Sequence, residues 1–181
     1  MNGISLGGLE TSTDEPTEGR RRRRAAGLAG LLARLALGGV LFAAGMLKLV
    51  DLDGAVRSVV AYDLVDYEIA AFIGLTLPVL EVAVGALLIL GLLTRGSAAV
   101  GTVLMLVFIG GIASAWARGL SIDCGCFGTG GQVAPGATRY LEEIVRDAAL
   151  AVAGVWLVVR PHTPLSVDGL LTRRATDGRN D

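Results

Sequence analysis

The chain has 181 residues, of which 52% are hydrophobic and only 18% are charged, and its net charge is −1. A soluble domain carries roughly 25% charged residues, so this composition argues against an ordinary soluble globular protein. Because most of the chain is apolar, nucleic-acid binding is not expected either, in spite of five consecutive arginines at Arg20–Arg24.

Four long apolar segments follow a polar start. Residues 1–24 have few apolar side chains to bury, so they are expected to form a disordered basic tail, and residues 160–181 a second polar tail. Each apolar segment approaches or exceeds the roughly 20 residues with which a helix crosses a bilayer. In chain order they are Ala25–Val50, Ile69–Leu93, Ser97–Ala117 and Leu141–Val159. The sequence therefore predicts an all-α, polytopic membrane four-helix bundle over residues 25–159.

The basic residues predict how this bundle is oriented in the cell membrane. Cytoplasmic loops carry an excess of Lys and Arg. If both termini are cytoplasmic, ten basic residues lie inside, and four lie outside: Lys48, Arg57, Arg118 and Arg139. Thr94–Gly96 is then a tight internal turn, whereas the connections Asp51–Glu68 and Arg118–Tyr140 are extracytoplasmic.

The connection Arg118–Tyr140 contains Cys124 and Cys126, which are the two cysteines of the chain. Both are expected in an oxidising compartment, where disulfides persist. A bond between them would close a loop so short that it removes only about 1.6 kcal/mol of unfolded-state entropy, too little for a structural staple. Strained, exposed disulfides are labile and oxidising, which suits a catalytic redox pair.

Two other interpretations of the cysteines remain open. They could be structural or incidental, or their thiolates could hold Cu(I). A closed zinc site needs four ligands, and the single histidine, His162, is predicted on the opposite side of the membrane. We therefore predict no metal centre and assign the catalytic role to Cys124 and Cys126.

Charged residues within the apolar segments form a second group of candidates. Arg34 and Glu81 are predicted at similar depths and are expected to meet near the middle of the bilayer, where a lone charge costs at least about 2.5–3.5 kcal/mol. Arg146 and Asp147 lie near the outer end of the fourth segment, where Asp147 could pair with Lys48. These groups are either structural ion pairs or a polar site for a quinone or a proton relay.

Several motifs resemble a known family. Arg34–Asp51 (RLALGGVLFAAGMLKLVD) and Pro78–Gly91 (PVLEVAVGALLILG) resemble the first two helices of the DoxX-like superfamily. Asp123–Gly128 (DCGCFG), followed by Arg146 and Asp147 in the last helix, resembles the MauE branch, the methylamine-utilisation membrane proteins.

The resemblance implies a four-helix membrane protein of thiol–disulfide chemistry, working with a thioredoxin-like partner in the maturation of exported disulfide-containing proteins. A wider analogy to DsbB-type proteins and vitamin K epoxide reductase implies a membrane quinone as the electron acceptor. Those proteins carry additional cysteines, so this chain would need a direct dithiol-to-quinone step or the cysteines of a partner.

The function expected from these observations is that of a thiol:quinone-type disulfide oxidoreductase, with electrons passing through Cys124 and Cys126. A non-catalytic membrane subunit that scaffolds a redox partner is the first alternative. A metal or small-solute carrier is the second, and it would need Arg34 and Glu81 to line a polar path.

Overall fold

The computed structural model describes residues 15–123, 131–134 and 138–160. Within them the chain is predominantly helical, with one short two-stranded ribbon. The elements, in chain order, are α1 (Glu15–Val50), α2 (Leu52–Ala61), α3 (Tyr67–Leu90), α4 (Thr94–Ala117), β1 (Ile122–Asp123), β2 (Gly131–Gln132) and α5 (Tyr140–Val159).

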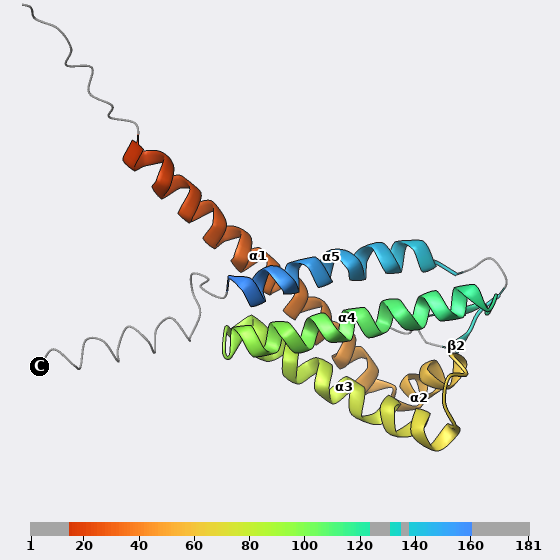
Figure 1. Ribbon diagram of the computed structural model, residues 1–181. Coiled ribbons are helices and arrows are strands. Elements are labelled where there is room, and N and C mark those ends of the chain that lie inside the picture. The colour runs from red at the N-terminus through yellow and green to blue at the C-terminus, as the bar shows by residue number, and fades with distance from the viewer. Residues whose placement is uncertain (1–14, 124–130, 135–137, 161–181) are drawn as a thin grey trace, which may run out of the picture.

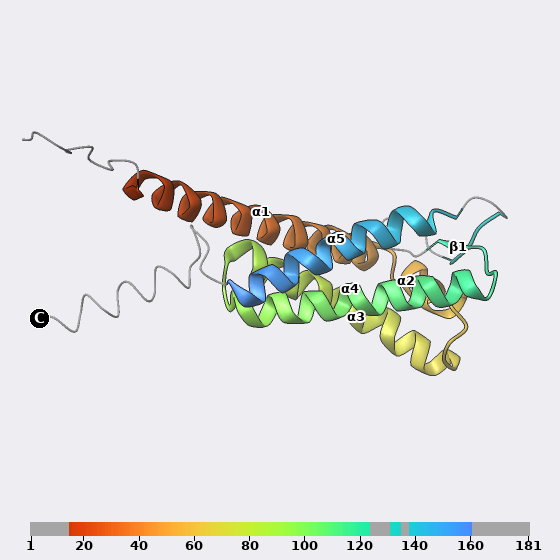
Figure 2. The ribbon, with the colours of Figure 1, turned by 45° about the horizontal axis from the view of Figure 1, so that its top comes forward.

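The four long helices run alongside one another in alternating directions (Figure 1). The turn between α3 and α4 and the last residues of α5 lie at one end of the bundle, which we call the turn end. The short helix α2 and the strands β1 and β2 lie at the opposite end, which we call the ribbon end. Figure 2 shows the same division from a second direction, with the N-terminal part of α1 projecting beyond the turn end.

Three of the described helices are long and apolar enough to cross a membrane: Ala25–Val50 within α1, α3 and α4. Many of their large apolar side chains point outward, among them Phe72, Val103 and Val107. The fourth predicted segment is also helical, as α5. Its first half carries four charged residues, Glu142, Glu143, Arg146 and Asp147, and it does not meet the same criteria of length and composition.

The helix boundaries differ from the sequence prediction at three places. Helix α1 begins at Glu15 and includes Arg20–Arg24, where a disordered tail is expected. The turn between α3 and α4 is Gly91–Leu93 rather than Thr94–Gly96, because Gly91 adopts a left-handed conformation (φ 68°) that ends α3. Helix α2 forms inside the predicted connection Asp51–Glu68, where Asp51 caps it by accepting a hydrogen bond from Gly54 N at 2.8 Å.

Small residues let α1 and α3 approach closely. A Cβ atom added to Gly85 would lie 2.6 Å from Phe42 N and 2.7 Å from Gly38 O, and one added to Gly45 would lie 2.8 Å from Pro78 O. Such close backbone approach is how small residues support helix packing in lipid. The contacts also fix an antiparallel register, in which Gly38 lies level with Gly85–Leu88 and Gly45 with Pro78–Val82.

The largest group of buried apolar side chains comes from all four long helices, and it includes Leu88 of α3. Leu37 and Leu41 of α1 are fully or almost fully buried and face Gly101 of α4. Gly154 of α5 faces both Leu37 and Thr102, the latter donating a hydrogen bond to Ala98 O at 2.7 Å. The bundle is therefore tightly packed around this part of α1.

Candidate functional site

The predicted catalytic cysteines lie in the connection between the two strands of the ribbon. β1 and β2 pair in antiparallel fashion, with Ile122 opposite Gln132 and Asp123 opposite Gly131. Cys124 and Cys126 lie outside the residues that the structure describes, but Asp123 directly precedes Cys124 in the chain. The ribbon therefore fixes where the cysteine-containing segment leaves and rejoins the bundle.

The base of the ribbon is anchored to the N-terminus of α5. The Tyr140 hydroxyl accepts a hydrogen bond from Ile122 N at 3.0 Å and donates one to Leu120 O at 2.6 Å. The Ile122 side chain is 2% exposed and packs in a cluster with Ile112, Ala115 and Tyr140. The start of the cysteine segment is thus held by hydrogen bonds and by a small hydrophobic core of its own.

A second anchor joins α4 to the end of α2. Arg118, which caps α4, donates hydrogen bonds to Asp63 O, at 3.2 Å, and to Tyr62 O. The Tyr62 ring packs against the cluster that contains Ile122 and would contact a Cβ at Gly111. Through Tyr62, α2 is therefore connected to the base of the ribbon.

The expected meeting of Arg34 and Glu81 is wrong. Glu81, which is fully buried, instead pairs with Lys48 of α1, whose Nζ donates a hydrogen bond to Glu81 Oε1 at 2.7 Å. Arg34 lies one turn before Gly38 and therefore near the turn end, whereas Glu81 is level with Gly45. The depths predicted for Arg34 and Glu81 were counted from residues 25 and 93, on the assumption that these two residues lie at the same level. They do not, because α1 extends past the α3–α4 turn.

Arg146 and Asp147 lie close to the Lys48–Glu81 pair. Asp147 is 1% exposed, and its Oδ1 accepts a hydrogen bond from Arg146 Nε at 3.0 Å. The predicted partner of Asp147, Lys48, makes its salt bridge with Glu81, although its charge also acts on the Asp147 carboxyl. Lys48, Glu81, Arg146 and Asp147 together form what we call the charge cluster, contributed by α1, α3 and α5.

Three of the four residues predicted as a quinone or ion-pair site are thus brought together, and Arg34 is not among them. The sequence prediction names Lys48 as a partner of Asp147 but not as a partner of Glu81. A sequence signal for this role exists, since Lys48 is the charged residue of the apolar stretch Leu35–Val50 and must be neutralised if it is buried. Among the described residues, no group of three or more His, Cys, Asp or Glu side chains could hold a metal ion.

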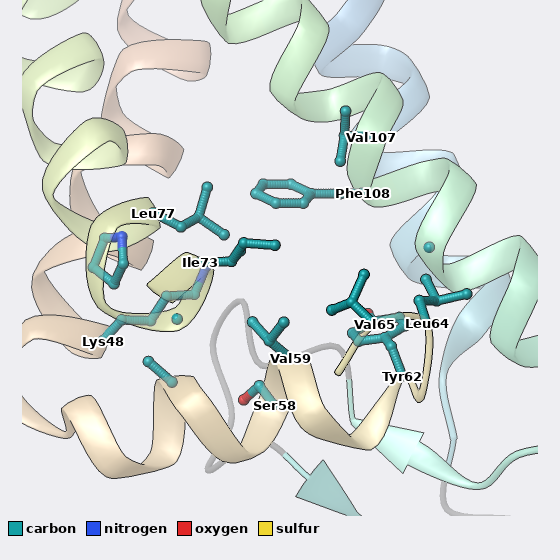
Figure 3. Close-up of a pocket in the computed structure, with 14 residues that line it drawn as sticks. Lys48, Ser58, Val59, Tyr62, Leu64, Val65, Ile73, Leu77, Val107 and Phe108 are labelled. Carbon is teal, nitrogen blue, oxygen red and sulfur yellow. The ribbon is translucent and has the colours of Figure 1, made fainter. Parts of the chain in front are cut away.

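Lys48 also lines a pocket of about 240 Å³ at the ribbon end, which we call the Lys48 pocket. Its walls come from α2, the α2–α3 connection, α3 and α4, and include Tyr62, Ile73, Leu77 and Phe108 (Figure 3). The ammonium lies 5.3 Å from the centre of the Phe108 ring, a cation–π arrangement. The pocket is therefore an apolar space with a positively charged group on one wall.

Comparison with known proteins identifies the family. No curated protein and no solved structure matches the chain. The family model described as methylamine utilisation protein MauE matches residues 26–160, which contain α3, α4, the ribbon and α5. The chain therefore belongs to the MauE family.

Proposed function

We propose that this MauE-family chain is a membrane thiol–disulfide redox protein. It exchanges electrons between a thioredoxin-like partner outside the cytoplasm and a membrane quinone, through Cys124 and Cys126. The observation that carries the proposal is the position of a Cys-Gly-Cys sequence immediately after β1, at an anchored ribbon on the end of the bundle away from the arginine run. At the end of the bundle, such a sequence can be reached by a folded partner.

The proposed topology has four crossings, with α5 as the fourth, and both termini in the cytoplasm. The alternating directions of α1, α3, α4 and α5 support it, as does the location of Arg20–Arg24 before the first span. The charged first half of α5 then belongs to the outer side, where Glu142 pairs with Arg139 at 3.4 Å and both side chains are exposed. The ribbon end is extracytoplasmic in this arrangement.

The proposed reaction has two balanced steps. A thiolate of the reduced partner attacks the Cys124–Cys126 disulfide and forms a mixed disulfide, which the second partner thiol resolves. The partner leaves as a disulfide, and Cys124 and Cys126 are left as thiols. The two thiols then lose two electrons and two protons, which are taken up by the quinone to give a quinol, and the disulfide forms again.

The first test measures the redox state of the two cysteines in native membranes. The pair should react with a membrane-impermeant alkylating reagent only after reduction, and it should become reduced when quinone is depleted. A Cys124→Ser variant should lose thiol oxidation of the partner. A Cys124→Ser protein with full activity would favour the scaffold alternative. A pair that is reduced whatever the quinone content would favour electron flow in the opposite direction.

The topology is tested separately, in a Cys124→Ser/Cys126→Ser background. Gly96→Cys places a thiol at the exposed turn end, and Gln132→Cys places one on the exposed face of β2. The impermeant reagent should label the second variant in intact cells and the first only after the membrane is opened. The reverse pattern would place the ribbon in the cytoplasm and contradict the proposed route of electrons.

A further inference from the structure

The Lys48 pocket exists because α3 and α4 separate toward the ribbon end. The two helices start together at the Gly91–Leu93 turn and diverge, and α2 lies across the gap between them (Figures 1 and 2). Gly74 allows α2 to lie close to α3, since a Cβ there would be 2.7 Å from Val56 Cα. Pro78, inside α3, removes one backbone hydrogen bond of the helix at the wall of the pocket.

The size and lining of the pocket suit a ring-shaped apolar ligand. A cavity of about 150 Å³ lined by apolar side chains is known to take up benzene, so 240 Å³ accommodates a substituted ring. Ile73, Leu77 and Phe108 supply apolar walls, and Lys48 is the charged residue among those that line it. Figure 3 shows these side chains directed into one space.

Lys48 can donate hydrogen bonds to such a ligand. An ammonium has three N–H donors and no acceptor. Within the part of the chain that the structure describes, the hydrogen bond of Lys48 Nζ goes to Glu81 Oε1, and its other contact is the face of the Phe108 ring. With one such hydrogen bond made, Lys48 keeps N–H donors that a ligand in the pocket it lines could use.

The charges around Lys48 favour a neutral ligand over an anion. Glu81, at 2.7 Å, already neutralises Lys48, and the Arg146–Asp147 pair adds no net charge to the charge cluster. A carboxylate or phosphate bound at Lys48 would leave an excess negative charge in an apolar environment, which is costly. A carbonyl oxygen needs a donor and brings no charge, so it matches the site.

The pocket opens between exposed apolar side chains. Leu64, Val65 and Val107 line it and are themselves 56%, 42% and 61% exposed. They form an apolar rim between the α2–α3 connection and α4, visible on the right of Figure 3. A ligand with a hydrocarbon tail can therefore place its ring inside while its tail stays in the bilayer.

The pocket is also connected to β1, which directly precedes Cys124 in the chain. Tyr62 lines the pocket and packs in the same cluster as Ile122, two residues before Cys124. A ring in the pocket therefore lies close to the base of the ribbon.

We propose that the Lys48 pocket is the quinone site, with Lys48 donating a hydrogen bond to one ring carbonyl. This inference rests on the proposed function and locates its electron acceptor away from Arg34. As the thiols of Cys124 and Cys126 give up their two electrons and two protons, negative charge grows on the ring oxygens. The Lys48 ammonium stabilises that charge, and the tail remains between Leu64 and Val107.

The test uses the full chain in lipid nanodiscs and a photoreactive azidoquinone with a short isoprenoid tail. Illumination should label residues of α2, α3 or α4 that line the pocket, as located by mass spectrometry of peptides. Lys48→Met/Glu81→Gln removes the ammonium without leaving a buried unpaired carboxylate, and it should weaken quinone binding at least tenfold. Arg57→Met is the control: it removes a cation whose side chain is 60% exposed, on α2, and it should leave quinone binding unchanged.

A second pair of variants keeps the test valid if the double variant fails to fold. Val107→Trp fills the mouth of the pocket, whereas Val103→Trp lies one turn away on α4, is 58% exposed in the parent, and does not line the pocket. Val107→Trp should abolish labelling, and Val103→Trp should not. Equal labelling of both, or labelling confined to other parts of the chain, would overturn the inference.

The binding data separate this inference from the proposed function. Quinone that binds in the pocket of a Cys124→Ser/Cys126→Ser protein with unchanged affinity supports the site, whatever the cysteines do. If wild-type protein binds quinone there but the cysteines never exchange electrons with it, the proposed function fails and the site stands. If a fatty acid binds at Lys48 and quinone does not, the site is one for an anionic lipid, and the inference is wrong.

Discussion

The two ends of the bundle are packed in opposite ways. Toward the turn end, glycines bring α1 within contact of α3, and Leu37 is fully buried among α1, α4 and α5. Toward the ribbon end, α3 and α4 diverge, and a ten-residue helix fills the gap incompletely. The difference indicates that the turn end holds the fold together, whereas the ribbon end carries the pocket, the charge cluster and the cysteine segment.

The largest effect is expected where the two halves meet, at the Lys48–Glu81 pair. Glu81→Gln keeps the volume of the side chain but leaves Lys48 with a weaker partner, and removing one member of a buried ion pair costs about 3–5 kcal/mol. The unfolding free energy in detergent should fall by that amount, whereas Glu142→Gln, at a 71%-exposed side chain, should have little effect. A loss below about 1 kcal/mol would show that the charge of Glu81 contributes little to stability.

The next largest effect is expected where α1 and α3 touch, at Gly85. Gly85→Ala forces a methyl group to within 2.6 Å of the α1 backbone, and such overpacking costs about 1–3 kcal/mol. Gly39→Ala is the matched control, because a Cβ at Gly39 meets nothing within 4 Å and alanine is the better helix former. Thermal unfolding should show a lower Tm for the first variant and an unchanged or higher Tm for the second. Equal Tm values would show that α1 and α3 can move apart at no cost.

A smaller, local effect is expected at the ribbon. Tyr140→Phe removes the acceptor of Ile122 N–H and the donor to Leu120 O, at a cost of about 1–3 kcal/mol. Amide hydrogen exchange of Ile122 should accelerate, while exchange in the core of α1 stays unchanged. Tyr67→Phe, at a 69%-exposed tyrosine, is the control. Faster exchange throughout the bundle would show that the ribbon is not a separate unit.

The smallest effect is expected on the surface of α2. Arg57 and Asp51 form a salt bridge at 3.4 Å, with side chains 60% and 55% exposed, and pairs of this kind contribute less than about 1 kcal/mol. Arg57→Met should therefore change the Tm little, and a small change should disappear at high salt. A larger, salt-independent loss would show that Arg57 contributes through packing rather than through charge.

Much of the helical architecture could be predicted from hydrophobicity. Long apolar segments such as Ser97–Ala117 coincide closely with the helices observed, because a run of that length in lipid has to satisfy its backbone internally. The missed helix α2 also has a sequence signal. Leu52, Ala55, Val56, Val59 and Val60 repeat with helical spacing after a capping aspartate, but a segment of ten residues is easily taken for a connection.

The pairing of charges could not be predicted in the same way. Choosing Lys48 over Arg34 as the partner of Glu81 requires the register between α1 and α3, which depends on how far α1 extends past the turn end. The register is set by close contacts at Gly38, Gly45 and Gly85, which are three-dimensional facts. The pocket depends likewise on the divergence of two helices, which no periodicity encodes.

The register between α1 and α3 also constrains how the sequence can drift. Because the backbones touch at Gly45 and Gly85, sliding one helix past the other by a turn is blocked, and the partners across the interface stay the same over evolutionary time. A mutation at Lys48 is then tolerated only with a matching change at Glu81, so that the two positions change together among relatives. In an alignment of relatives, this covariation should mark the membrane-buried charge pair more clearly than the conservation of either residue.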